Sequence, residues 1–272
     1  MNNSYKLKNS AKELNKQIEQ HLVELAQATD KARTSEEMLR YLDFCAKFHQ
    51  YSAGNIWLIM LAKPDATYVA GFHKWKSMGR WVQKGERGIP ILAPVLVKDE
   101  NNEDGIDTKR LVGFKTVYVF DVSQTEGEPL PPIPDWKSPE KNLELNKRLI
   151  KFAEIKGIKV SFKKLPGDIQ GVSKGNEIEV ATSAGTKTLV HEIAHELMHQ
   201  GNDMFLDKAN RELEAESVAF VVCKHFGIGN LNSPNYIALH DASTEKLFAH
   251  MTKIQGMANE IIIAISLNSC YS

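Results

Sequence analysis

The sequence predicts an α+β fold in two domains, an N-terminal α+β domain followed by a mainly helical domain with a small β-sheet. Three observations support this prediction. Apolar residues recur at intervals of three and four along several segments, which indicates amphipathic helices. Two β-rich segments, 89–97 and 111–122, flank a polar turn, which is typical of a hairpin. A Pro-rich stretch without periodicity, 125–135, then divides the 272-residue chain.

The first domain is expected to begin with two helices. Residues 10–29 carry apolar side chains at helical spacing, and a second helix is expected from Thr34 or Ser35 onward. Thr34 and Glu37 have the spacing of a capping box. A short apolar helix is expected over residues 55–62, before the hairpin.

We place the N-terminal domain at residues 1–125, a Pro-rich linker at 126–138 and the second domain at 139–272. The second domain is expected to contain a helix near 139–155, strands near 158–162 and 177–180, and three or four further helices.

Composition narrows the functional classes. Thirty-four basic and 34 acidic residues give a formal net charge of zero, so bulk charge favours neither nucleic acid nor membrane. Three cysteines without CxxC spacing argue against a disulfide framework or a cysteine-based zinc site. No secretory signal and no apolar run of membrane-spanning length is recognised. We therefore expect a cytoplasmic, soluble protein without a membrane partner.

The segment 187–200 contains an HExxH motif. Helical periodicity places His191 and His195 one turn apart on one face, where two imidazoles can bind one Zn²⁺ ion. Glu192 between them is the candidate general base. Glu196 is a departure, because it puts a charge where zinc helices usually have neutral residues around the second histidine.

A third protein ligand must come from another part of the chain. His199 lies roughly 12 Å along the helix axis from His191, since each residue rises about 1.5 Å, so both cannot bind one ion on a straight helix. We expect His199 at the surface or beside a ligand. Gly201 occupies the position where a metzincin would have its third histidine, which excludes that class.

The next helical segment offers a better ligand. Glu212 and Glu216 lie one turn apart, so the first can bind the metal while the second accepts a hydrogen bond from a ligand histidine. Glu214 points to a different face and is the weaker candidate. These residues predict a gluzincin-type zinc peptidase in which Glu192 transfers protons during hydrolysis. Tyr236, or His240 one turn later, is a candidate partner for the oxyanion.

The motifs HEIAHELMH and ELEAE resemble the zinc helix and glutamate helix of ImmA/IrrE-type metallopeptidases and of the C-terminal domain of ArdC-like antirestriction proteins. The resemblance extends over about residues 140–265 and is strong over 187–222. It implies that Glu212 is a metal ligand and that Glu216 supports a ligand histidine.

A basic and aromatic segment precedes the hairpin. Between residues 70 and 98 there are six basic residues and one acid. Aromatic side chains among cations suit single-stranded nucleic acid, because bases stack on rings while cations contact phosphates. The candidate phosphate contacts are Lys74, Lys76, Arg80, Lys84 and Arg87, and the candidate base contacts are Tyr51, Trp75 and Trp81.

Residues 40–97 also resemble a known family. The order YSxxN, AxxVAGFxxW and GRxVxKGExGIxILAP is similar to the N-terminal single-stranded-DNA-binding domain of ArdC-like proteins. The resemblance implies a DNA-binding module fused to a zinc peptidase, typical of plasmids, conjugative elements and phages, with single-stranded DNA and an unidentified protein substrate as partners.

Two other hypotheses remain open. The chain could be a non-catalytic, protective DNA-binding protein with a vestigial metal site. It could also be a regulatory peptidase that cleaves one repressor.

Overall fold

The structure is a computed structural model that describes residues 10–27, 31–98, 109–130, 139–200, 207–229, 231, 234 and 243–267. Helices and small sheets follow one another along the chain, which confirms the predicted α+β class. The chain divides into two compact units. Unit 1 comprises Met1–Val23 and Gly54–Pro131, and unit 2 comprises Glu24–Ala53 and Pro132–Ser272. The sequence predicted two domains that follow one another along the chain, whereas residues 24–53 belong with the C-terminal unit.

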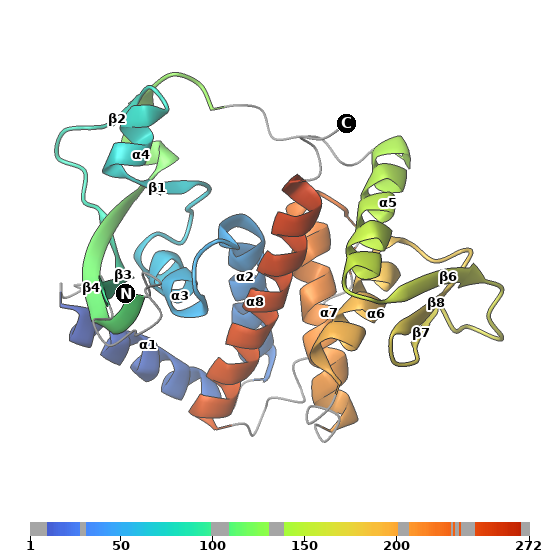
Figure 1. Ribbon diagram of the computed structural model, residues 1–272. Helices are drawn as coiled ribbons and strands as arrows, with labels where there is room; N and C mark the ends of the chain where they lie inside the picture. The colour runs from blue at the N-terminus through green and yellow to red at the C-terminus, as the bar shows by residue number, and fades with distance from the viewer. Residues whose placement is uncertain are drawn as a thin grey trace. The chain divides into compact units, whose positions relative to one another are not determined.

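Unit 1 contains most of α1 (Ala11–Ala26) and the elements from α3 to β5 (Figure 1). In chain order the latter are α3 (Ala53–Ala62), β1 (Val69–Gly71), α4 (Phe72–Ser77), β2 (Arg80–Val82), β3 (Ile89–Lys98), β4 (Lys109–Asp121), the 3-10 helix η1 (Val122–Gln124) and β5 (Thr125–Gly127). Strand β4 lies between β1 and β3 in an antiparallel sheet, and β2 pairs with β5 in a second one.

The predicted hairpin is confirmed as β3 and β4, with a register shift between Val95 and Leu96. Its turn, residues 99–108, lies outside the described residues. Strand β5 was not predicted, because Glu126 and Gly127 were expected to belong to the linker. They pair instead with Trp81 and Arg80 of β2, so backbone hydrogen bonds hold this part of the Pro-rich stretch in unit 1.

The core of unit 1 forms around α3, which is buried along most of its length. Trp57 on this helix and Trp75 on α4 are fully buried. The ring of His21 on α1 packs against Trp57 with centroids 4.7 Å apart. A helix that is apolar on nearly every side is typical of a core position.

Unit 2 contains α2 (Lys31–Phe48) and the elements from α5 to α8 (Figure 1). The latter are α5 (Pro139–Ile155), β6 (Lys159–Lys163), β7 (Gly171–Ser173), β8 (Glu177–Ala181), α6 (Thr186–Met198), α7 (Lys208–His225) and α8 (Thr244–Leu267). Strand β8 pairs in parallel with β6 and antiparallel with β7. The sequence predicted β6 and β8, but β7 is too short to show a periodic pattern.

Helix α2 begins at Lys31, so the predicted start at Thr34 or Ser35 was wrong. The residues added at the start, Lys31 to Arg33, include good helix formers, and this explains the extension. Hydrogen bonds from the chain around the end of α2 to α7 and α8 explain why it belongs to unit 2. His225 donates to the carbonyl of Ala46 at 2.8 Å, and Gln255 donates to the carbonyl of His49 at 2.7 Å.

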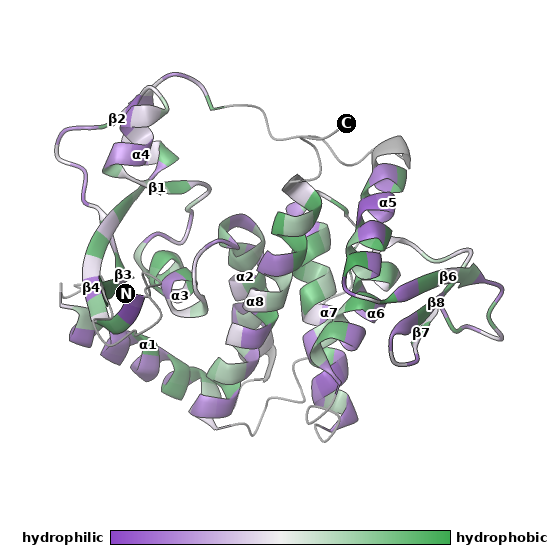
Figure 2. Ribbon diagram, viewed as in Figure 1, coloured by the Kyte–Doolittle hydropathy of each residue, from purple (hydrophilic) through white to green (hydrophobic). Residues whose placement is uncertain are grey.

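Helix α7 lies at the centre of unit 2 and packs against α2, α6 and α8. Both hydrophilic and hydrophobic residues occur along α8 (Figure 2), whereas α7 is buried over most of its length. Cys45 and Cys223 are free and buried, and burial raises the pKa of each thiol to about 12. Neither cysteine is therefore a nucleophile near neutral pH.

None of the described helices combines the length and the apolar composition needed to cross a membrane.

Candidate metal centre

Helix α6 presents the two histidines of the HExxH motif. It buries Leu189, Val190, Ile193 and Ala194, so the face with His191 and His195 is left partly exposed. The two rings lie one turn apart with centroids 4.6 Å apart. Their Nε2 atoms are 3.0 Å apart, so both rings face one point, as predicted.

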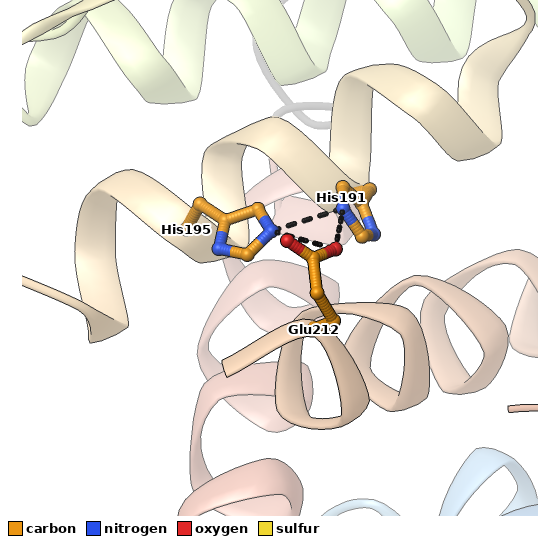
Figure 3. A group of neighbouring side chains, drawn as sticks. All are labelled: His191, His195 and Glu212. Atoms are coloured by element: carbon orange, nitrogen blue, oxygen red, sulfur yellow. Dashed lines mark hydrogen bonds and ion pairs between the residues drawn. The ribbon is translucent and has the colours of Figure 1, made fainter. Parts of the chain in front are cut away.

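Helix α7 brings Glu212 to the same point. Asp207 caps this helix by accepting a hydrogen bond from the backbone of Asn210, which places Glu212 in the second turn. The Oε2 atom of Glu212 lies 3.4 Å from His191 Nε2 and 3.5 Å from His195 Nε2. Figure 3 shows the carboxylate of Glu212 pointing at both rings across the gap between the helices.

These three side chains fit a divalent ion. In a tetrahedral site with bonds of about 2.0–2.1 Å, ligand atoms lie about 3.3 Å from one another. The separations of 3.0, 3.4 and 3.5 Å bracket that value. Among the described residues, His191, His195 and Glu212 form a group whose donor atoms could hold a metal ion.

The electrostatics of the group favour a cation. Burial lowers the pKa of His191, but the nearby carboxylates of Glu212 and Glu216 outweigh this and raise it to about 9. His191 and His195 in turn hold the pKa of Glu212 far below its usual range. Two carboxylates around the imidazoles therefore stabilise positive charge at this point.

Glu216 lies beside the Nδ1 atom of His191, whereas Glu212 lies beside the Nε2 atom of the same ring. Its Oε2 atom is 3.3 Å from His191 Nδ1, while its Oε1 atom forms a short ion pair with Lys187. The carboxylate can thus support the ring of His191, as expected for a group that orients a metal ligand.

Glu192 lies on the same helix and beside β7. Its side chain is 7% exposed, and burial raises its pKa. A Cβ atom built on Gly171 would lie 2.6 Å from Glu192 Oε1, so β7 passes very close to the carboxylate. Glu192 also lines a cavity of about 790 Å³ that includes His191, His195 and Glu212. The general-base candidate and the three candidate metal ligands therefore line one cavity.

Glu196 has a structural role that explains its unusual place in the motif. It accepts hydrogen bonds from Ser173 Oγ at 2.5 Å and from the backbone of Gly175 and Asn176 at 2.9 and 2.6 Å. Gly175 and Asn176 both have positive φ, as a tight turn between β7 and β8 requires. The charge of Glu196 therefore holds this turn against α6.

A second group of polar residues lies behind the histidines. The sequence predicted His199 at the surface or beside a ligand, and the structure places it beside His195. His199 is 7% exposed, and its Nδ1 atom lies 2.9 Å from Nδ1 of His195. Its Nε2 atom contacts Glu214, which is 1% exposed and also accepts from His250 at 2.6 Å and from Lys253 at 3.2 Å. The four-residue spacing of His195 and His199 is the sequence feature that indicates their contact. The partners on α7 and α8 could not be inferred from spacing.

Burial raises the pKa of Glu214, but hydrogen bonds from His199 and His250 and the charge of Lys253 lower it to about 2. Glu214 is therefore an ionised carboxylate inside unit 2. Tyr236 and His240, the residues predicted to stabilise the oxyanion, lie outside the described residues.

One of the predicted nucleic-acid contacts in unit 1, Trp75, is corrected, and the guanidinium of another, Arg80, has hydrogen-bond partners within the unit. Trp75 is fully buried and donates a hydrogen bond from Nε1 to the carbonyl of Phe120 at 2.9 Å, so it is a core residue. Arg80 joins β2 to β5 through hydrogen bonds to the side chain and carbonyl of Thr125, at 2.8 and 3.0 Å. Trp75 was predicted as a contact because spacing does not distinguish a core tryptophan from an exposed one.

The other candidates in unit 1 remain accessible. Trp81 is 52% exposed. Lys74, Lys76, Lys84 and Arg87 are also exposed. Tyr51 is half-buried and belongs to unit 2.

Comparisons with known proteins agree with the N-terminal motifs. Residues 8–120 match the family model of the N-terminal domain of anti-restriction factor ArdC. An uncharacterized protein of Bacillus anthracis is 29% identical over 270 residues, which cover 82% of this chain and 46% of the relative. The chain thus spans about half the length of that curated relative.

Among solved structures, the chain aligns with the antirestriction ArdC protein from R388 plasmid. The metal-free form gives a TM-score of 0.48 at 18% identity, over 80% of this chain and 84% of that one. The Mn(II)-bound form gives a TM-score of 0.46 at 18% identity, over 81% and 84%. The family match ends before the candidate metal centre, which is therefore judged on its own geometry.

Proposed function

We propose that this chain is an ArdC-like antirestriction protein of a mobile element and that unit 2 is a metal-dependent peptidase. The match of residues 8–120 supports the first part. The observation that supports the second part, the metal-dependent peptidase, is that His191, His195 and Glu212 meet at one point. Glu192 lines the same cavity. A structural metal site normally has four closed protein ligands and no need for a nearby base.

The three ligands suit Zn²⁺, because two imidazoles and one carboxylate are the ligand set of several zinc peptidases. When bound, the ion would supply a Lewis acid that polarises a carbonyl and makes water easier to deprotonate. Glu192 would accept the proton from water at its carboxylate and then deliver it to the amine that leaves. The peptide C–N bond is replaced by a C–O bond from water, so no other reactant is needed.

The chain also offers a way to hold an extended substrate. Strand β7 is at the edge of its sheet and lines the cavity next to the metal ligands. Backbone groups on an edge strand can pair with an added peptide strand. We expect unfolded or extended protein segments, rather than compact domains, to be cleaved.

The experiment compares the full chain with Glu192→Gln, loaded with Zn²⁺ or Mn²⁺, for metal content and for cleavage of an unfolded fluorescent protein. We expect the variant to keep its metal and to lose roughly 10²–10⁴-fold in turnover, the usual contribution of a general base. Glu154→Gln is the matched control, because Glu154 is an exposed carboxylate on α5. Full turnover by Glu192→Gln would end the general-base proposal, and a metal-loaded protein without turnover would favour the binding-protein alternative.

A second function, the binding of single-stranded DNA by unit 1, is proposed from the exposed cations and Trp81. Lysines at 74, 76 and 84 are accessible, and an exposed indole can stack on a base. Removing three phosphate contacts should weaken oligonucleotide binding and reduce its dependence on salt. Trp81→Ala should cost about 1–3 kcal/mol of binding with the salt dependence kept.

The DNA experiment uses the full chain with Lys74, Lys76 and Lys84 replaced together by Ala. The matched control replaces Lys147, Lys151 and Lys164, which are exposed on unit 2. Equal loss in both triple variants would mean that binding follows total charge and not this surface. Cleavage of one repressor without any effect of DNA would favour the regulatory alternative.

A further inference from the structure

The second nitrogen of each ligand histidine has a different partner. His191 Nδ1 lies 3.3 Å from the carboxylate of Glu216. Among the described residues, no carboxylate contacts His195 Nδ1, which lies 2.9 Å from Nδ1 of His199. A carboxylate is reached one step further on, because His199 Nε2 is 2.9 Å from Glu214 Oε2.

We propose that His199 and Glu214 are positioning residues that orient His195 for the metal. This inference rests on the proposed metal-dependent function and concerns how one of its ligands is held. A ligand histidine usually donates its free N–H to a carboxylate, carbonyl or water, which sets the tautomer and the ring orientation. Here a second histidine takes the place of that acceptor.

The direction of each hydrogen bond follows from the role of His195. Its Nε2 faces His191 and Glu212, so that nitrogen needs a free lone pair and the proton is on Nδ1. The Nδ1–H of His195 then donates to Nδ1 of His199. His199 in turn carries its proton on Nε2 and donates to Glu214 Oε2. Each donor in this series of hydrogen bonds, from His195 through His199 to Glu214, therefore meets an acceptor.

Glu214 is held in place at the far end of this series of hydrogen bonds. It is 1% exposed, His250 donates to its Oε1 atom at 2.6 Å, and Lys253 lies 3.2 Å from its Oε2 atom. These contacts come from α8, while Glu214 is on α7 and His199 follows α6. The orientation of His195 thus depends on three helices that pack together in unit 2.

The test measures metal affinity by competition with a chelator, together with the visible absorption of the Co²⁺-loaded full chain, which reports coordination geometry. His199→Leu removes both hydrogen bonds, and we expect its metal Kd to rise roughly 10–100-fold with an altered Co²⁺ spectrum. His199→Asn keeps an acceptor near the position of Nδ1, so it should recover part of the affinity and the native spectrum.

His49→Leu is the matched control, because His49 is equally buried in unit 2 and its Nδ1 bonds to Asn259 instead of to a metal ligand. It should lose stability and keep its metal affinity. An unchanged Kd and spectrum in His199→Leu, or an equal rise of Kd in His49→Leu, would overturn the proposal. A wild-type chain that binds no metal would instead show that the proposed function itself is wrong.

Discussion

The side-chain amide of Asn55 forms both hydrogen bonds of a strand pairing with the backbone of Leu92. Asn55 Nδ2 donates to the carbonyl of Leu92 at 2.9 Å, and the N–H of Leu92 donates to Asn55 Oδ1 at 2.8 Å. Among the strands that the structure describes, none pairs with Leu92 on that side, so helix α3 covers part of the open edge of β3. A covered edge is protected from pairing with other chains.

Replacing this amide should destabilise unit 1. Asn55→Ala removes two hydrogen bonds from the half-buried backbone groups of Leu92, which we expect to cost about 1–3 kcal/mol in the free energy of unfolding. Urea unfolding of the full chain measures the change. Asn15→Ala, an exposed asparagine on α1, should stay within about 0.5 kcal/mol of wild type. A loss no larger than in this control would mean that the pairing contributes nothing.

Asp121 should make the stability of unit 1 depend on acid pH. The side chain is 1% exposed and accepts hydrogen bonds from the backbone of Thr67 and Ser123, at 2.8 and 3.0 Å. Burial raises its pKa, but these hydrogen bonds outweigh burial and lower the pKa below the usual 3.8. Because the folded pKa is depressed, the stabilisation is present above about pH 3.8 and is lost as pH falls through the folded value.

The measurement is urea unfolding between pH 7 and pH 2. Asp121→Asn puts an N–H₂ group against backbone donors, so it should cost about 1–3 kcal/mol at pH 7 and show a flatter decline in acid. The exposed Glu154→Gln is the control, and it should follow the wild-type curve. Parallel acid declines in Asp121→Asn and wild type would contradict the prediction.

Gly171→Ala should impair hydrolysis without removing the metal. The added Cβ would lie 2.6 Å from Glu192 Oε1 and 2.7 Å from its Cγ, so the carboxylate must turn away. Misplacing a catalytic group by about 1 Å can cost roughly 10²-fold in rate, and we expect a loss of that order in turnover.

The control is Gly229→Ala, since a Cβ at Gly229 meets no atom within 4 Å. Metal content and turnover are measured on the same preparations. Wild-type turnover in Gly171→Ala would show that Glu192 tolerates the displacement or does not act as the base.

Metal should stabilise unit 2 through its three ligands. An ion that binds the folded chain at 1,000 times its Kd adds about 4.1 kcal/mol to the free energy of unfolding. We expect wild type to gain stability of this order when Zn²⁺ is added after treatment with a chelator, and Glu212→Ala to gain much less. Glu154→Ala, with the metal site intact, should gain as much as wild type. Equal gains in Glu212→Ala and wild type would place the stabilising ion elsewhere.

Local features of the chain were predicted from sequence with good accuracy. His191 and His195 share a face because they are one helical turn apart, which holds wherever the helix forms. The hairpin of β3 and β4 was also predicted, since two β-rich runs flank a polar turn. The start of α2 was not predicted, because helix-forming residues extend the helix before the expected cap. Strand β5 was not predicted either, because it forms by pairing with β2, which is distant in the sequence.

Residue patterns were less informative about what each side chain does. Trp75 and Trp81 lie six residues apart in the same basic segment, yet the first is fully buried and the second is exposed. The charge of Glu196 on α6 has no explanation in the local sequence, but backbone N–H groups in the turn between β7 and β8 donate to it. In both cases the neighbours come from distant parts of the chain.

By itself, the sequence determined the helical spacing of the two histidines, the candidate base between them and the carboxylates one turn apart on a later helix, because these relationships are set by backbone periodicity. Only the tertiary structure decided that Glu212 meets both rings and that Glu214 reaches His195 through His199. Those contacts depend on how α6, α7 and α8 pack, and packing is determined by buried surfaces that no local pattern specifies.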